Sequence, residues 1–179
     1  MVVGYLPGHG HRPDRGSNWD PGAVSPEGWS EAALVVDVAT TAVATRLKGK
    51  LPTALLAAGS YSARGKAAEA MRCDLVVQLH ADASAAETGP DIARVFYWPR
   101  NQDGQHAAED IARRLRSVLP WAVKVMEAGE EWPNARWCLG QVVPTSVLVE
   151  LGFTDGAKGR VDLPRLATAI GTALGQPAP

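Results

Sequence analysis

Residues 74–80 read Asp-Leu-Val-Val-Gln-Leu-His, and residues 146–150 read Ser-Val-Leu-Val-Glu. Each is a short, nearly continuous apolar run of the kind found in strands that are buried on both faces of a sheet. Sheets that are covered on both faces are usually built from parallel strands connected by helices. Both runs end in an ionisable side chain. They therefore predict an α/β fold in which central strands deliver polar groups to one edge.

The rest of the chain alternates between strand-like and helical patterns. We predict further strands over residues 2–6, 53–58 and 94–98. We predict helices from Ser30 as N-cap to Gly49, over residues 62–72 and 102–119, and from about Asp162 to the C-terminal end. The predicted architecture is a single domain, residues 1–176, with residues 177–179 as a flexible tail. Its sheet is twisted, mostly parallel or mixed, with about six strands and with helices on both faces.

Composition excludes several classes of function. The chain has 179 residues, with 18 Lys+Arg against 19 Asp+Glu and a net charge near −1. Nucleic-acid binding lacks an electrostatic basis because there is no basic run, and no apolar stretch approaches the roughly 20 residues that span a bilayer. Cys73 and Cys138 are too few for a disulfide framework and lack a metal-binding spacing, so we expect two buried thiols.

Three apolar runs are followed by polar groups that bind metals well. The first leads to Gly8-His9-Gly10-His11, the second to His80-Ala81-Asp82, and the third to Glu150. If these strands are parallel neighbours, the groups converge in the crevice beyond their carboxyl ends, where α/β proteins bind ligands. Imidazole and carboxylate groups on rigid strands suit zinc. Each residue also has a structural interpretation: His9 or His11 as a solvated turn residue, and Glu31 as a carboxylate that the helix dipole favours.

Four blocks, taken in order, resemble the zinc-dependent N-acetylmuramoyl-L-alanine amidases of the amidase-3 type, including phage-endolysin catalytic domains. The blocks are Pro7-Gly8-His9-Gly10, Gly28-Trp29-Ser30-Glu31, the run from Cys73 to Asp82 with Arg64 upstream of it, and the run from Pro144 to Phe153. The resemblance extends from about residue 3 to residue 174. The chain departs from the family pattern in a longer loop between His9 and Glu31 and in Asp82, where the family has asparagine.

The resemblance implies a ligand set and a reaction. Zn²⁺, one ion per chain, would be held by His9, Glu31 and His80, and Glu150 would be catalytic. The expected function is hydrolysis of the amide between the lactyl group of N-acetylmuramic acid and L-alanine in bacterial peptidoglycan. Alternatives are a zinc hydrolase that acts on another amide or peptide, and a peptidoglycan-binding protein without catalysis; no ligand position is missing, which disfavours the latter.

Aromatic side chains suit a glycopeptide substrate because their faces pack on sugars while their polar edges stay wet. Trp19, Trp29, Trp132 and Trp137 are candidates, whereas Trp98 and Trp121 are expected to fill the core. We predict substrate contacts for Arg64, Trp29 and Trp132. The expected partner is peptidoglycan or a muropeptide, bound by a monomer without nucleic acid or membrane insertion. The N-terminal residues do not resemble a signal peptide. The chain is thus expected to reach the wall from the cytoplasm, as phage lysins do, or to be secreted with its leader removed.

Overall fold

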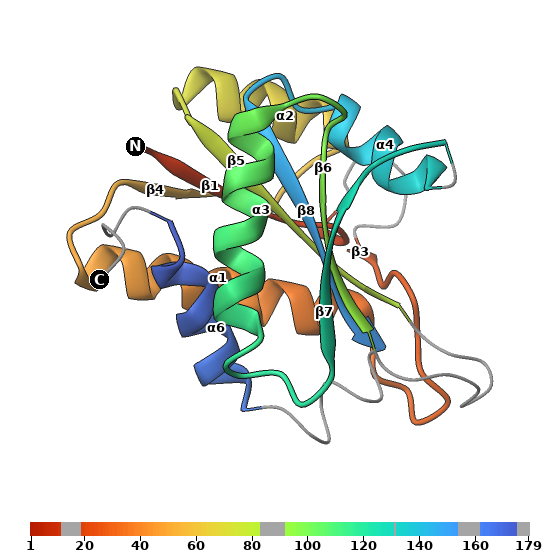
Figure 1. The fold of residues 1–179 in the computed structure, drawn as a ribbon. Coiled ribbons are helices and arrows are strands. Elements are labelled where there is room, and N and C mark those ends of the chain that lie inside the picture. Colours follow the sequence, from red (N-terminus) through yellow and green to blue (C-terminus); the bar gives the residue numbers. More distant parts are fainter. Residues whose placement is uncertain (12–18, 83–91, 131, 154–161, 175–179) are drawn as a thin grey trace.

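The computed structural model describes residues 1–11, 19–82, 92–130, 132–153 and 162–174. Its centre is a six-stranded sheet in the order β4-β1-β5-β8-β6-β7 (Figure 1). The strands of this sheet are β1 Val3–Pro7, β4 Thr53–Leu55, β5 Leu75–Asp82, β6 Ile92–Tyr97, β7 Ala122–Glu127 and β8 Thr145–Phe153. The two apolar runs that predicted the fold are β5 and β8, which lie side by side at the middle of the sheet.

The sheet is mixed, as expected. Strands β4, β1, β5 and β8 are parallel, whereas β6 runs antiparallel to β8 and carries β7 parallel to itself. Because β1, β5 and β8 are parallel neighbours, their carboxyl ends meet at one edge. Pro7 lies opposite Leu79, and His80 lies opposite Glu150. The polar groups that follow these strands therefore meet at one edge of the sheet, as the sequence predicted.

Helices cover both faces of the sheet, as predicted (Figure 1). Helices α1, α3 and α6 enclose the larger buried apolar cluster on one face, and α2 and α4 enclose a smaller one on the other. The bounds are α1 Glu31–Lys48, α2 Tyr61–Ala70, α3 Gln102–Leu115, α4 Pro133–Gly140 and α6 Leu163–Thr172. The α/β class is confirmed. Both cysteines are buried and free.

Helix α1 is fixed at both of its ends. Ser30 is the N-cap, and its hydroxyl oxygen accepts a hydrogen bond from the backbone N–H of Ala33 at 3.3 Å. Near the other end, the buried Arg46 donates to the carbonyl oxygens of Gly171 and Leu174 and so joins α1 to α6. No helix in the described ranges is long and apolar enough to cross a membrane.

Four elements were not predicted from the sequence: β7, α4, and the short strands β2 (Gly10–His11) and β3 (Trp19–Asp20), which pair as a hairpin. Strand β7 is an edge strand with several exposed side chains, and α4 has only eight residues, so neither carries a strong hydrophobic period. Strands β5 and β8 also extend past the predicted ends, which puts His80 and Glu150 inside strands. The predicted tail and the domain boundary after residue 176 lie outside the described residues.

Candidate metal and catalytic site

His9 lies in the turn between β1 and β2. Gly8, which precedes it, continues the pairing of β1 with β5 by donating its N–H to the carbonyl oxygen of Leu79 at 2.7 Å. Gly8 is required here because a Cβ atom would overlap the imidazole ring of His80. The His9 Nδ1 atom lies 3.1 Å from a carboxylate oxygen of Asp20, and its Nε2 atom lies 3.3 Å from Glu31. Its two ring nitrogens thus face two different carboxylates.

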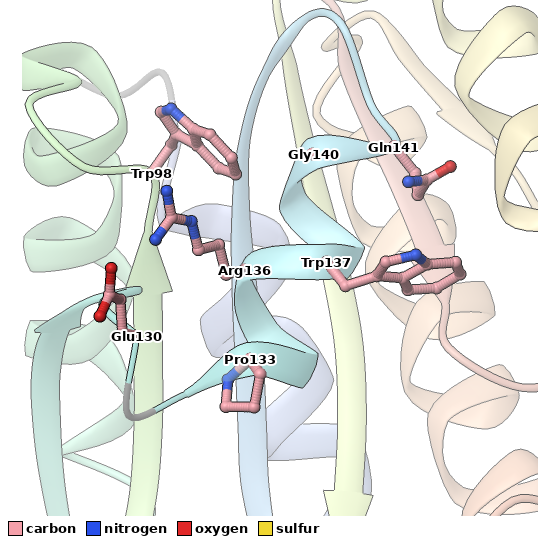
Figure 2. Close-up of a pocket in the computed structure, with 7 residues that line it drawn as sticks. All are labelled: Trp98, Glu130, Pro133, Arg136, Trp137, Gly140 and Gln141. Atoms are coloured by element: carbon pink, nitrogen blue, oxygen red, sulfur yellow. The ribbon is translucent and has the colours of Figure 1, made fainter.

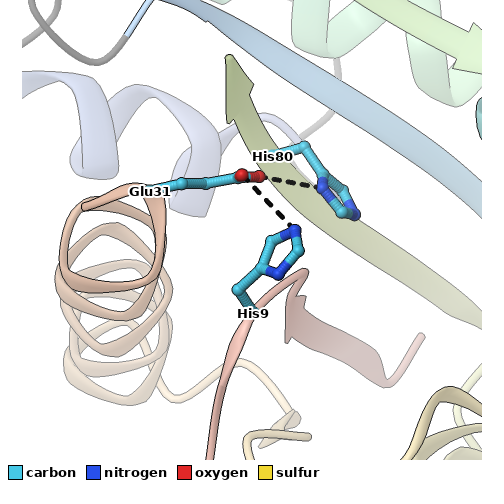
Figure 3. A group of neighbouring side chains, drawn as sticks. All are labelled: His9, Glu31 and His80. Atoms are coloured by element: carbon cyan, nitrogen blue, oxygen red, sulfur yellow. Dashed lines mark hydrogen bonds and ion pairs between the residues drawn. The ribbon is translucent and has the colours of Figure 1, made fainter. Parts of the chain in front are cut away.

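Glu31 is the first residue of α1, and its carboxylate is buried between the two histidines (Figure 3). One oxygen accepts a hydrogen bond from the backbone N–H of Ala23, and the other from that of Ala81, both at 3.0 Å. Burial alone would raise the pKa of Glu31, but the hydrogen bond with His80 and the charges of His80 and His9 outweigh burial and lower it. The carboxylate therefore stays ionised.

His80 projects from β5 and is 8% exposed. Its Nδ1 lies 3.0 Å from Glu31, and its Nε2 contacts the hydroxyl of Tyr61. Burial would lower the pKa of His80, but a hydrogen bond with Cys138 and the carboxylates of Glu31 and Glu150 raise it to about 10. The raised pKa reflects negative surroundings that favour a positive charge on the His80 ring.

The three side chains form a group that can hold a metal ion. One ligand atom from each of His9, Glu31 and His80 lies within 4.8 Å of the others. Zinc binds nitrogen and oxygen ligands at 2.0–2.2 Å in a tetrahedron, so its ligand atoms are roughly 3.3 Å apart. His9 Nε2 lies 3.3 Å from one oxygen of Glu31 and His80 Nδ1 lies 3.0 Å from the other, so each imidazole approaches the carboxylate at about that spacing. Two imidazoles and a carboxylate are also the donor set of catalytic zinc sites.

Glu150 lies on β8 opposite His80, and its Oε2 atom is buried without a hydrogen-bond partner. Burial raises the pKa of Glu150 to about 7; His80 opposes this rise, and the nearby carboxylates of Asp82 and Glu31 add to it. A buried carboxylate without a partner is uncommon in native proteins and often marks a functional group. A group with a pKa near neutrality can both accept and donate a proton.

All four residues line one cavity of about 340 Å³ at the carboxyl edge of the sheet. Its lining also includes residues that the sequence did not indicate as site residues: Asp20, Tyr61, Asn134, Ala135, Cys138 and Leu148. Trp137, one of the tryptophans considered for substrate contact, lines the cavity as well. Asp20 lies in the hairpin, and Asn134, Ala135 and Cys138 lie in α4, so their position was not evident without those elements. Gly22 also closes the site, because a Cβ atom there would lie 2.6 Å from Glu31 and 2.7 Å from His9.

The predicted substrate-contact residues lie around the cavity but not in its lining. Arg64 is fully buried, and its guanidinium donates to the carbonyl oxygens of Gly59 and Pro7, which fixes the segment before His9. Trp29 is 47% exposed and lies two residues before Glu31. Trp132 packs on Phe96 with Arg94 over its ring. Substrate contact stays a prediction for Arg64, Trp29 and Trp132. Trp98, expected in the core, is instead 38% exposed, a difference taken up below.

The family model for N-acetylmuramoyl-L-alanine amidases (Amidase_3) matches residues 5–163, which is most of the chain. The chain belongs to this family. Membership confirms the resemblance found in the sequence and assigns the chain to the amidases that hydrolyse the bond between N-acetylmuramic acid and L-alanine in peptidoglycan. None of the curated proteins with which the sequence was compared matches it.

Solved structures of amidases share the fold. AmiC2 of Nostoc punctiforme has a TM-score of 0.76 and 18% identity, over 97% of this chain and 94% of that one. Ami1 of Mycobacterium smegmatis has a TM-score of 0.70 and 19% identity, over 97% and 94%. The catalytic domain of the CD27L endolysin, which targets Clostridia difficile, has a TM-score of 0.73 and 20% identity, over 97% and 96%. At these identities the likeness concerns the fold.

Proposed function

We propose that this amidase is zinc-dependent, with one Zn²⁺ held by His9, Glu31 and His80 and with Glu150 as the catalytic acid and base. The observation that carries the proposal is the spacing of the three ligand atoms beside Glu150, whose Oε2 atom is buried without a hydrogen-bond partner. The negative groups that raise the pKa of His80, among them Glu31 and Glu150, add support, because they also stabilise a metal cation, which displaces the proton when it binds.

The donor set supports a catalytic rather than a purely structural metal. Structural zinc sites have four protein ligands, whereas catalytic sites use three and leave one position for water or substrate. Within the described residues, the group contains three candidate ligands. When bound, zinc lowers the pKa of a coordinated water to about 7 and polarises the carbonyl of the amide.

Glu150 is placed to move the proton of the reaction. Its carboxylate faces the same cavity as the three ligands, and it lies opposite His80 in the sheet. We assign Glu150 as the group that takes a proton from the attacking water and later gives it to the departing nitrogen of L-alanine. Burial raises the pKa of Glu150 above its ordinary value, which favours a carboxyl group that can both take up and release a proton.

Two neighbours orient the histidine ligands. The carboxylate of Asp20 lies 3.1 Å from the Nδ1 atom of His9 without hydrogen-bond geometry, and its negative charge favours a proton on Nδ1, which leaves Nε2 free for a metal. The hydroxyl of Tyr61 contacts the Nε2 atom of His80 and leaves Nδ1 directed at Glu31. The metal-facing atoms are then Nε2 of His9 and Nδ1 of His80. Both rings are fixed before metal binds.

We infer that the protein acts on the bacterial cell wall, as a monomer whose partner is polymeric peptidoglycan. The endolysin catalytic domain among the structural neighbours supports a lytic role. Release through holes in the membrane, as for phage lysins, and secretion with removal of a leader are the two routes that we propose.

The decisive experiment measures metal content and amide hydrolysis in three forms of the protein. We expect wild type to contain about one zinc per chain and to release new L-alanine amino groups from purified sacculi, with loss of activity in chelator. Glu150→Gln should keep the zinc and lose at least about a hundredfold in turnover. His80→Ala should lose both.

Glu69→Gln is the matched control, because Glu69 is an exposed glutamate on α2 and its loss should change neither zinc nor turnover. If the protein contains zinc but releases no alanine amino groups, its substrate is another amide or peptide. A folded protein that binds no zinc in a zinc-supplemented buffer would refute the ligand set, and an active Glu150→Gln protein would refute the role of Glu150.

A further inference from the structure

A second cavity, of about 480 Å³, lies over the outer face of α4, and we call it the α4 groove (Figure 2). Its lining comes from Trp98, Glu130, the α4 residues Pro133, Arg136, Trp137 and Gly140, and Gln141, which follows the helix. Trp98 follows β6, and Trp137 belongs to α4, so two indoles border the groove from different elements. Figure 2 shows their rings on the two flanks of the helix.

The two indoles are unusually accessible for such large apolar groups. Trp98 is 38% exposed and Trp137 is 54% exposed. Between them lies Gly140, where an added Cβ atom would come within 3.4 Å of the Trp98 ring. This is an ordinary van der Waals distance, so the Trp98 ring packs close to the helix at Gly140. Exposed aromatic side chains with polar neighbours are typical of a binding surface.

The α4 groove and the catalytic cavity share one lining side chain. Trp137 lines both, and its ring is 5.4 Å from that of Tyr61, measured between centroids. Tyr61 in turn contacts His80. A polymer whose scissile amide lies beside Glu150 would therefore pass over Trp137 if it extended in this direction.

The charges of the groove favour a neutral ligand. Arg136 places its guanidinium over the Trp98 ring, 5.8 Å from the ring centroid, and Glu130 supplies the opposite charge. Gln141 adds an uncharged amide. The stem peptide of peptidoglycan carries free carboxylates, which a groove with balanced charge does not preferentially attract. Sugar rings are uncharged, with apolar faces that stack on indoles and hydroxyls that hydrogen-bond to charged and amide side chains.

We propose that the α4 groove binds the glycan strand of peptidoglycan, with sugar rings stacked on Trp98 and Trp137. This proposal rests on the proposed function, since it extends the same substrate away from the scissile amide. It gives the chain a means to hold the polymer beyond the bond that it cleaves. Sugar binding would also explain why Trp98 is exposed, which the sequence did not predict.

The first test is binding, which does not depend on catalysis. The probe is a tetramer of N-acetylglucosamine, added to ¹⁵N-labelled protein while the indole N–H signals are followed by NMR; Trp98→Phe identifies the Trp98 signal. We expect the signals of Trp98 and Trp137 to shift and that of Trp121, which lines neither cavity, to stay. The matched probe is the stem peptide L-alanyl-γ-D-glutamyl-L-lysine, which should leave Trp98 unchanged.

Variants then measure the contribution of Trp98. Trp98→Ala should weaken tetramer binding roughly tenfold, and Trp98→Phe should retain most of it because an aromatic face remains. Kinetics on soluble glycan strands that still carry their stem peptides should show a loss in kcat/KM that comes mainly from KM. Val143→Ala is the control, because Val143 is 78% exposed and lies outside the groove.

Two outcomes would overturn the proposal: no shift at Trp98 with the tetramer, or a shift at Trp98 with the stem peptide. The second would reassign the groove to the peptide part of the substrate. Either result leaves the proposed amidase reaction intact if alanine amino groups are still released from sacculi. Conversely, if the protein binds the tetramer but cleaves no muramoyl amide, glycan binding by the α4 groove is supported and the amidase reaction is refuted.

Discussion

At the scale of single residues, the contact between His9 and Asp20 decides how well the metal site is prepared. The Nδ1 atom of His9 and a carboxylate oxygen of Asp20 lie 3.1 Å apart. Asp20→Ala should lower zinc affinity about 10–100-fold, because the ring loses the group that fixes its tautomer and orientation. Competition with a chromophoric chelator measures the affinity. Asp37→Ala, at an exposed position of α1, should leave it unchanged, and an equal effect of both variants would contradict this role.

The ionisation of Glu150 should determine where kcat/KM falls on the acidic side of its pH profile. Its pKa is raised to about 7 in the metal-free protein, chiefly by burial. The carboxylate form of Glu150 is lost as pH falls through this pKa, so kcat/KM should fall on acidification. Because a bound cation lowers the pKa of Glu150, this acidic fall in kcat/KM should be centred at or below about pH 7. Asp82 raises the pKa of Glu150, so Asp82→Asn should shift this fall to lower pH. A shift to higher pH would exclude Glu150 as the titrating base.

At the scale of elements, the packing of α1 against α6 holds the helix that begins with Glu31. Arg46 is buried and donates to two carbonyl oxygens at the end of α6. Arg46→Ala should lower the free energy of unfolding by about 3 kcal/mol, because it leaves those carbonyls without donors and removes buried packing. Urea denaturation measures the change. Lys48→Ala, exposed on the same helix, should stay within about 0.5 kcal/mol, and similar losses in both variants would contradict the argument.

At the scale of the whole molecule, the proposed metal should stabilise the fold. His9 follows β1, Glu31 begins α1 and His80 lies in β5, so unfolding separates the three ligands. An ion that binds only the folded state adds about 4 kcal/mol at a thousandfold excess over its Kd, which raises Tm by roughly 10 °C for a chain of this size. Thermal melts with zinc and with chelator measure this. His80→Ala should show no such response; a zinc-dependent rise in its Tm would place the ion elsewhere.

The sequence predicted those parts of the fold whose signals are local. The continuous apolar runs of β5 and β8 indicated a doubly covered sheet, and the cap at Ser30 and Gly49 gave the bounds of α1. The polar residues at the ends of these runs indicated a metal site because parallel neighbours share an edge. Elements without a strong hydrophobic period were not predicted. The most important of these is α4, because it places Trp137 and Cys138 in the lining of the catalytic cavity.

By itself, the sequence determined the α/β class, the family and the identity of the candidate ligands, because apolar runs and motif spacing are properties of contiguous residues. Only the tertiary structure decided which groups surround those ligands. Asp20 reaches His9 through a hairpin, Tyr61 reaches His80 from α2, and Trp98 meets the face of α4 instead of entering the core. These contacts join residues far apart in the chain, and they arise from the packing of elements, which no local pattern encodes.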